Sequence, residues 1–228
     1  MNRVYAKYLA MGGIALLLFA VQPAVIWLGI TVSPFFLILL AGVIPGAILW
    51  RRRGILRSGA EGERKTKKLL KKLPAGYTVF SDITLTVGEK EGQLDFVVLG
   101  KNGIFNVEVK NIKGKVTGNA SDAKLSLQKD YGAEKNRKKT LYNPLHQAKG
   151  QCNLLSECLR KNGLPVEAQP VVWLSFEGVE LVLAGRPEYL LSAAEGEDTL
   201  CRYIKGYSGK LSKKEQEKAE QIIRGAIR

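Results

Sequence analysis

The chain has almost none of the side chains from which zinc sites and disulfide frameworks are built. Its 228 residues include one histidine, His146, and three cysteines, Cys152, Cys158 and Cys201, without CxxC spacing. A single histidine excludes every site that needs two, and an odd number of scattered cysteines argues against both disulfide pairing and zinc binding. We therefore expect a protein of a reducing compartment that binds no zinc.

Acidic residues are absent from residues 1–53, and charge of either sign is absent from residues 8–50. As one helix, this uncharged run would measure about 65 Å, roughly twice the hydrocarbon core of a bilayer. Two spans, 8–29 and 33–50, fit better. They predict a transmembrane helical hairpin over residues 1–53 that contacts membrane lipids through residues 8–50. A cleaved signal peptide over residues 1–30 is disfavoured because a second apolar segment follows at once.

Basic residues flank both ends of this predicted hairpin, with Arg3 and Lys7 before it and Arg51, Arg52 and Arg53 after it. Because positively charged flanks stay on the cytoplasmic side, we expect a multi-pass protein of the cell membrane with both termini in the cytoplasm. The whole chain carries a net charge of +14, which favours anionic partners such as nucleic acid or acidic lipid.

The remaining residues alternate between helical and strand-like patterns after a short linker expected at residues 54–62. We expect a helix at about 60–73, strands at 77–85, 93–99, 103–110 and 114–118, a lysine-rich edge hairpin within 119–142, a helix at 144–161, strands at 169–176 and 179–183, a short helix within 187–205, and a last helix that begins at the capping box Ser212–Glu215. This order, αβββ, insertion, αββ, αα, predicts an α/β fold with a mixed sheet.

Two carboxylates face each other if strands 93–99 and 103–110 form a hairpin with a four-residue loop at 100–103. In that register Asp95 lies opposite Glu108, with Cβ atoms about 4.5–5.5 Å apart. Like charges at this distance repel, and a divalent cation between them would reverse the sign of the interaction. Lys110 lies on the same face, where it can hold an attacking water or the developing charge on a phosphate.

A solvated hairpin face with alternating charges explains the same pattern without any site. Two further residues favour the site. Glu63 extends the buried stripe of the 60–73 helix by one step, and an acidic residue on a buried face is unusual. Gln147 lies in the first turn of the 144–161 helix, on a stripe that borders its apolar face.

Three segments together resemble the nuclease-related domain (NERD) family of the PD-(D/E)XK phosphodiesterase superfamily. They are GAEGE at 59–63, QLDFVVLGKNGIFNVEVKNIKGKVTG at 93–118 and NPLHQA at 143–148. The resemblance covers roughly residues 58–176. It implies a restriction-endonuclease-like αβββαβ core with a mixed sheet after the two transmembrane helices. The nuclease-like domain would occupy residues 63–185, and a helical extension residues 186–228.

By matching positions, the resemblance assigns Asp95, Glu108 and Lys110 to the D…(D/E)xK triplet. It makes Glu63 the acid of the first helix and Gln147 the glutamine of the second. Asp95, Glu108 and Glu63 would hold Mg²⁺ or Mn²⁺. The chain departs from the superfamily pattern in two places: Leu94 stands where a proline often precedes the aspartate, and Gln151 stands where relatives often carry tyrosine.

Basic residues in the segment 119–142 are candidates for nucleic-acid contacts. They are Lys124, Lys129, Lys135, Arg137, Lys138 and Lys139, and two tyrosines lie among them. Basic and aromatic side chains together suit phosphate contacts and base stacking. The alternative is an edge hairpin that lysines protect from aggregation. His146 is disfavoured as a catalytic base because it points in a different helical direction from Gln147.

These observations predict a membrane-anchored, Mg²⁺- or Mn²⁺-dependent nuclease that hydrolyses phosphodiester bonds of cytoplasmic nucleic acid, with DNA favoured over RNA. Two other classes of protein stay open. One is a nucleic-acid-binding module that cleaves nothing, and the other is a membrane-associated scaffold whose lysines bind lipid headgroups. The sequence leaves strandedness, sequence preference and oligomeric state undetermined.

Overall fold

The computed structural model describes Gly13, Leu16, Ala20, residues 35–129 and residues 137–226. The chain divides into two compact units, Met1–Glu61 and Gly62–Arg228. The expected first membrane span, residues 8–29, lies outside the described residues except for three positions. Within the described part of the chain, no helix is both long enough and apolar enough to cross a membrane.

Helix α2 (Phe35–Leu70) passes without a break through the segment 54–62, where we expected a linker. The helix expected at 60–73 is the last part of α2. The segment 54–62 contains no proline to stop the helix, and near its end the hydroxyl of Thr66 bonds to the carbonyl of Gly62 at 2.8 Å.

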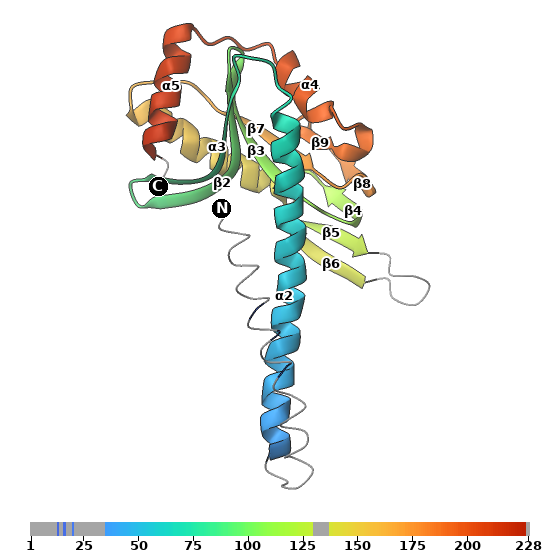
Figure 1. The fold of residues 1–228 in the computed structure, drawn as a ribbon. Coiled ribbons are helices and arrows are strands. Elements are labelled where there is room, and N and C mark those ends of the chain that lie inside the picture. The colour runs from blue at the N-terminus through green and yellow to red at the C-terminus, as the bar shows by residue number, and fades with distance from the viewer. Residues whose placement is uncertain (1–12, 14–15, 17–19, 21–34, 130–136, 227–228) are drawn as a thin grey trace. The chain divides into compact units, whose positions relative to one another are not determined.

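The second unit contains two mixed sheets, whereas the sequence suggested one (Figure 1). The larger has the order β1-β2-β3-β7-β9, with β1 (Thr78–Val87), β2 (Lys90–Gly100), β3 (Gly103–Lys110), β7 (Gln169–Leu174) and β9 (Leu190–Ser192). The smaller has the order β6-β5-β4-β8, with β4 (Gly114–Asn119), β5 (Lys124–Lys129), β6 (Arg137–Tyr142) and β8 (Val179–Ala184). The expected hairpin in 119–142 is β5–β6, and β6 is an edge strand.

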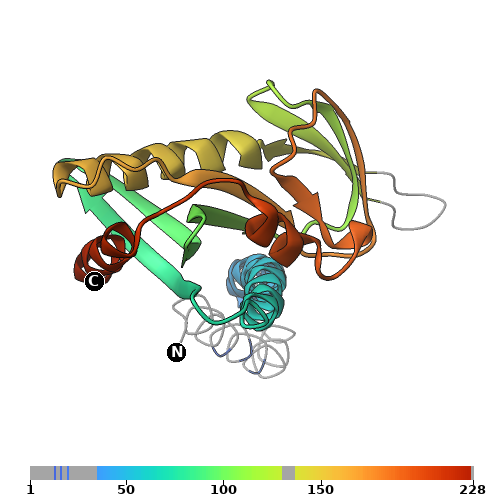
Figure 2. The same ribbon diagram turned by 90° about the horizontal axis from the view of Figure 1, so that it is seen from above.

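Helices cover both faces of the larger sheet (Figure 2). On one face, α3 (Pro144–Lys161) packs with β1, β2 and the C-terminal helix α5 (Lys213–Ala226) around a cluster that includes Leu94, Ile104 and Leu155. On the other face, α4 (Thr199–Gly206) and the last turns of α2 pack on Phe96, Phe105 and other apolar residues of β2, β3 and β7. The sheet is therefore buried on both sides.

The segment 187–205, expected as a short helix, forms three elements. Leu190–Ser192 is β9, the short helix η1 covers Ala193–Glu195, and only the last part is the helix α4. β9 forms because Leu190 and Leu191 are buried in a parallel pairing with β7. The capping box expected at the last helix is present: the Ser212 amide donates to Glu215 Oε2 at 2.7 Å, and the Glu215 amide donates to Ser212 Oγ at 3.3 Å.

Candidate active site

Strands β2 and β3 pair in the register that the sequence predicted. Leu99 lies opposite Ile104, and the ladder runs from Gly100–Gly103 to Phe96–Val107. The connection is a two-residue turn rather than a four-residue loop. The ladder ends one step before Asp95 would meet Glu108. Instead, Asp95 Oδ2 accepts a hydrogen bond from the backbone amide of Val109 at 2.8 Å, so a carboxylate takes the place of a strand partner.

Glu108 lies under α3 and is only 1% exposed. Its Oε1 pairs with Lys110 Nζ at 2.5 Å, and its Oε2 accepts a hydrogen bond from Gln151 Nε2 at 2.7 Å. Both oxygens of this buried carboxylate are therefore bonded, one of them to a positive charge. The burial excludes the alternative of a solvated hairpin face.

Glu63 approaches the pair from α2, where Gly62 allows a close contact between the helix and the ends of β3 and β7. A Cβ atom added at Gly62 would lie 2.7 Å from Ser175 Oγ and 2.9 Å from Asn111 Cβ. One turn further along α2, Lys67 Nζ donates to Ser81 Oγ of β1 at 3.0 Å. These contacts hold Glu63 near enough to Asp95 for its charge to act on that carboxyl.

The pKa of Asp95 rises to about 7 in this environment. Burial is the largest cause, and the negative charges of Glu108 and Glu63 add to it. The amide of Val109 and the charge of Lys110 act in the opposite direction but do not compensate. Glu63, Glu108 and Lys110, which the sequence singled out with Asp95, thus all act on the Asp95 carboxyl. Of the four residues Glu108 is buried and the other three are half-buried.

Gln147 does not reach this point. It is half-buried, and in the described part of the chain no hydrogen bond links its side chain to the carboxylates. Gln151, one helical turn later, occupies the expected place. It also donates from Nε2 to the carbonyl of Gln93 at 2.8 Å and accepts from Asn106 Nδ2 at 2.8 Å. The sequence signal for Gln151 was its position on the same helical stripe as Gln147.

The donor set of this site suits a hard divalent cation. Carboxylate oxygens are the ligands that Mg²⁺ and Mn²⁺ prefer. The raised pKa of Asp95, which comes first from burial and then from the charges of Glu108 and Glu63, means that its ionised form is unfavourable here, and a bound cation would favour that form. Among the described residues, no group of three or more His, Cys, Asp and Glu side chains lies in an arrangement that could already hold a metal ion.

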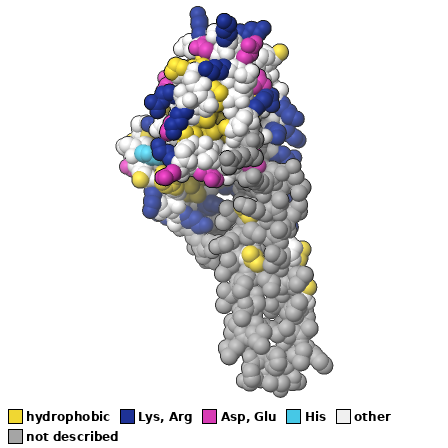
Figure 3. Space-filling model, turned by 90° about the vertical axis from the view of Figure 1, so that its left-hand side faces the viewer, with side chains coloured by type: hydrophobic (Ala, Val, Ile, Leu, Met, Phe, Trp, Pro, Cys, Tyr) yellow, Lys and Arg dark blue, Asp and Glu magenta, His cyan; other side chains and the backbone are white. Residues whose placement is uncertain are grey.

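The candidate nucleic-acid residues lie on both faces of the β5–β6 hairpin. Lys124 and Lys138 lie on the same face as Ser126 and Thr140, opposite the apolar core. Lys129 and Lys139 lie on the face of the buried leucines Leu125 and Leu127. Lys135 and the side chain of Arg137 lie outside the described residues. On the face drawn in Figure 3, Lys and Arg side chains are interspersed with acidic ones.

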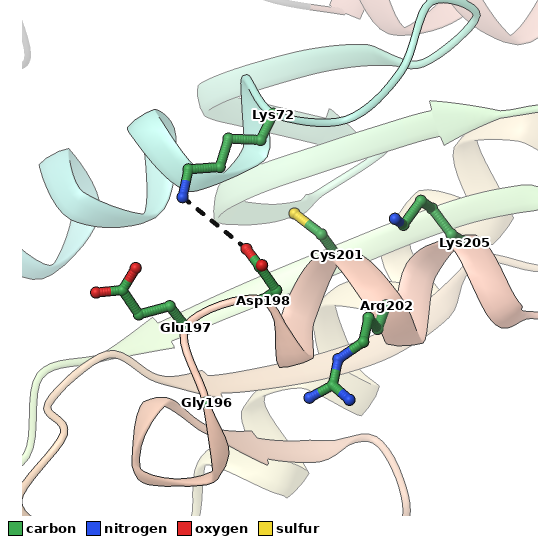
Figure 4. Close-up of a pocket in the computed structure, with 7 residues that line it drawn as sticks. All are labelled: Lys72, Gly196, Glu197, Asp198, Cys201, Arg202 and Lys205. Carbon is green, nitrogen blue, oxygen red and sulfur yellow. Dashed lines mark ion pairs between the residues drawn. The ribbon is translucent and has the colours of Figure 1, made fainter.

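Two further polar features, His146 and one pocket, do not include the carboxylates of this site. His146 is exposed, and its Nε2 lies 3.2 Å from the carbonyl of Ser121. A pocket of about 680 Å³ lies between the end of α2 and α4 and is drawn in Figure 4. It is lined by Lys72, Gly196, Glu197, Asp198, Cys201, Arg202 and Lys205, none of which belongs to the predicted site. Lys72 and Asp198 form an exposed ion pair across it at 3.9 Å.

Comparisons with known proteins find similarity over the part of the chain that contains these residues. The family model described as "Nuclease-related domain" (NERD) matches residues 58–175, just over half of the chain. An uncharacterized protein of Bacillus anthracis is 32% identical over 115 residues, which cover 50% of this chain and 52% of the relative. The chain thus spans about half the length of that curated relative. No solved structure matches the chain significantly.

Proposed function

Because the chain belongs to the nuclease-related domain family, we propose that its second unit is a metal-dependent nuclease. The observation that carries the proposal is the grouping of Glu63, Glu108 and Lys110 around Asp95, close enough for all three charges to act on its carboxyl. The pKa of about 7 for Asp95 means that this arrangement is unfavourable at neutral pH without added positive charge. A divalent cation would supply that charge, and it would also polarise the phosphate during hydrolysis of a phosphodiester bond.

Asp95, Glu108 and Glu63 would hold Mg²⁺ or Mn²⁺, which supplies Lewis-acid polarisation of the phosphate and a more acidic water. Gln151 fixes the orientation of Glu108 because one end of its amide is bound by Asn106 and the other donates to the carboxylate. The ammonium of Lys110 lies beside Glu108, where it can donate to a phosphate oxygen or to the attacking water.

A cleavage assay on the purified full chain tests this proposal directly. The substrates are plasmid DNA, single-stranded DNA and RNA, each with Mg²⁺, Mn²⁺ or EDTA, and the Glu108→Gln variant serves as the inactive control. We expect cleavage with either metal, none with EDTA, and faster cleavage of DNA than of RNA. Cleavage that persists in EDTA, or in Glu108→Gln at the wild-type rate, would exclude this site as its source.

One observation favours a second function, nucleic-acid binding without cleavage. Both oxygens of Glu108 are already bonded, one to Lys110 and one to Gln151, so the ammonium of Lys110 can itself balance the carboxylate. A binding module of this kind would retain DNA in EDTA and would not cleave it with any divalent metal.

We also propose that residues 8–50 anchor the protein in the cell membrane and leave both termini in the cytoplasm. The support is the uncharged run itself and the basic residues Arg51, Arg52 and Arg53 that follow it. Reporter fusions at Met1 and at Arg228 test the arrangement. Both should report the cytoplasm, and an extracytoplasmic signal at Arg228 would contradict access to cytoplasmic nucleic acid.

A further inference from the structure

Asp82 has a backbone conformation that is rare for its residue type and position. It lies inside β1, yet its φ is 58°, and it is the one residue other than glycine with positive φ among the described residues. This left-handed region is open to glycine, is visited by Asp and Asn, and is strongly disfavoured for β-branched residues. A strand interrupted in this way marks a position where the surrounding structure imposes the conformation.

The interruption falls opposite Asp95. Strands β1 and β2 pair in constant register on either side, with Ser81 opposite Phe96 and Ile83 opposite Leu94, so Asp82 is the residue that would face Asp95. That pairing is missing from the ladder. The β2–β3 ladder also stops at Phe96. Asp95 is therefore outside the regular pairing on both sides, although it lies in the middle of β2.

Hydrogen bonds from side chains flank the missing Asp82–Asp95 pair on both sides. Asp82 Oδ1 accepts from Gln93 Nε2 at 2.9 Å, across to β2 and two residues from Asp95. The carbonyl of Gln93 in turn accepts from Gln151 Nε2. On the other side of the gap, the carboxylate of Asp95 binds the amide of Val109. The strand is thus anchored beside Asp95, and the side chain of Asp95 turns to β3.

We propose that the left-handed backbone of Asp82 keeps Asp95 out of the β1–β2 ladder and so positions the Asp95 carboxylate against Val109. Asp82 is then a positioning residue whose conformation matters and whose charge does not. The inference rests on the proposed function only for its consequence, metal binding. Its structural claim stands on the ladder and the Val109 bond, which can be observed without metal.

The experiment compares substitutions that separate conformation from charge. Asp82→Asn can adopt positive φ and keeps an acceptor for Gln93. Asp82→Gly can adopt positive φ but has no acceptor, and Asp82→Val strongly disfavours positive φ. Asp82→Ala restricts the backbone with less bulk and is used if the valine variant does not fold. Thr86→Val, an exposed β1 position of ordinary conformation, controls for added β-branching. The primary measurement is amide hydrogen exchange at Val109 by NMR on the full chain in EDTA.

We expect Val109 to exchange at the wild-type rate in Asp82→Asn, Asp82→Gly and Thr86→Val, and roughly tenfold or more faster in Asp82→Val. Wild-type protection of Val109 in folded Asp82→Val and Asp82→Ala would overturn the proposal. So would a loss of protection in Asp82→Asn as large as in Asp82→Val, because charge would then be the cause.

A Mn²⁺ titration of melting temperature separates this inference from the proposed function. Mn²⁺ should raise the melting temperature of wild type and Asp82→Asn, and much less that of Asp82→Val. If Mn²⁺ stabilises no variant while the exchange pattern at Val109 is as expected, Asp82 positions Asp95 and the nuclease proposal fails. If Mn²⁺ stabilises Asp82→Val as much as wild type, metal binding does not depend on the position of Asp95, and the inferred consequence of the Asp82 conformation is wrong.

Discussion

Replacing Asp95 with asparagine should stabilise the metal-free protein at neutral pH, although it removes a candidate metal ligand. The pKa of the carboxyl rises from 3.8 to about 7 on folding, chiefly through burial and then through the charge of Glu108. Each pKa unit corresponds to about 1.4 kcal/mol, so the ionised side chain costs the fold about 4 kcal/mol above pH 7. Asparagine is never charged and can still accept the hydrogen bond from Val109.

The sign of this effect fixes its pH dependence. A raised pKa in the folded state means that the wild type is not penalised below pH 3.8, where the carboxyl is protonated in both states. Between pH 3.8 and about 7 the unfolded chain has released the proton and the folded chain has not, so wild-type stability falls. The advantage of Asp95→Asn should therefore grow through this window and level off above pH 7.

Chemical denaturation of the full chain in EDTA from pH 3.5 to 8.5, followed by circular dichroism, measures this difference. Glu89→Gln, an exposed carboxylate in the turn between β1 and β2, is the control and should stay within about 0.5 kcal/mol at every pH. Adding Mn²⁺ should make the wild type more stable than Asp95→Asn, because only the wild type offers the metal a negatively charged ligand at residue 95. Equal or lower stability of Asp95→Asn at pH 8 would show that Asp95 is a structural residue in a favourable environment.

Three further predictions address the other residues of the site and the basic surface. Lys110→Ala should lower turnover roughly 100-fold but leave Mn²⁺ affinity equal or higher, because a competing ammonium is gone from Glu108; weaker Mn²⁺ binding in a titration would contradict this role. Gln151→Leu should destabilise the fold by about 1–3 kcal/mol and weaken Mn²⁺ binding, whereas Gln147→Leu should do neither; equal denaturation midpoints for the two variants would refute the assignment. Lys124→Gln with Lys138→Gln should reduce the salt dependence of DNA binding by about two units of slope, and Lys129→Gln with Lys139→Gln by less than one; the reverse order would place DNA on the other face.

The register of the central hairpin was predictable because several local signals agree. The turn signal at Gly100–Gly103 is flanked by two runs of apolar residues, and only one register gives both strands a continuous buried core. The conformation of Asp82 was not predictable in this way. Phe80 and Ile83 belong to the same core cluster although they lie three residues apart, so the period of two breaks at Asp82. The break alone does not say which residue has the left-handed backbone.

Which of Gln147 and Gln151 contacts Glu108 depends on the axial position of α3 relative to the sheet. The two residues are one turn apart on the same stripe, so helical periodicity places both toward the sheet. The structure fixes the axial position at the N-cap. Asn143 Nδ2 donates to the carbonyls of Ala120 and Asp122, which ties the start of α3 to the loop after β4. This anchor, a long-range contact with no local signal, brings Gln151 and not Gln147 to Glu108.

The separation of the lysines on β5–β6 has a similar cause. Whether Lys124 and Lys138 share a face depends on how the hairpin is paired, and the segment between the strands gives no turn signal that fixes the pairing. The observed register puts Gln128 opposite Lys138 and Leu127 opposite Lys139. The sequence groups these lysines as one set of candidates, and strand alternation divides Lys124 and Lys138 from Lys129 and Lys139.

The two central carboxylates differ in how the fold supports them, and this difference suggests different roles. Glu108 is bonded at both oxygens, by Lys110 and by Gln151, so its charge and its orientation are already fixed. Asp95 has the Val109 amide as a partner and lies within reach of two negative charges. A cation in the site would therefore interact more favourably with Asp95 than with Glu108. A cation that balances the charge of Asp95 would also remove the cost of burying that charge in the fold. Metal binding and the stability of this sheet should therefore be coupled through that one residue.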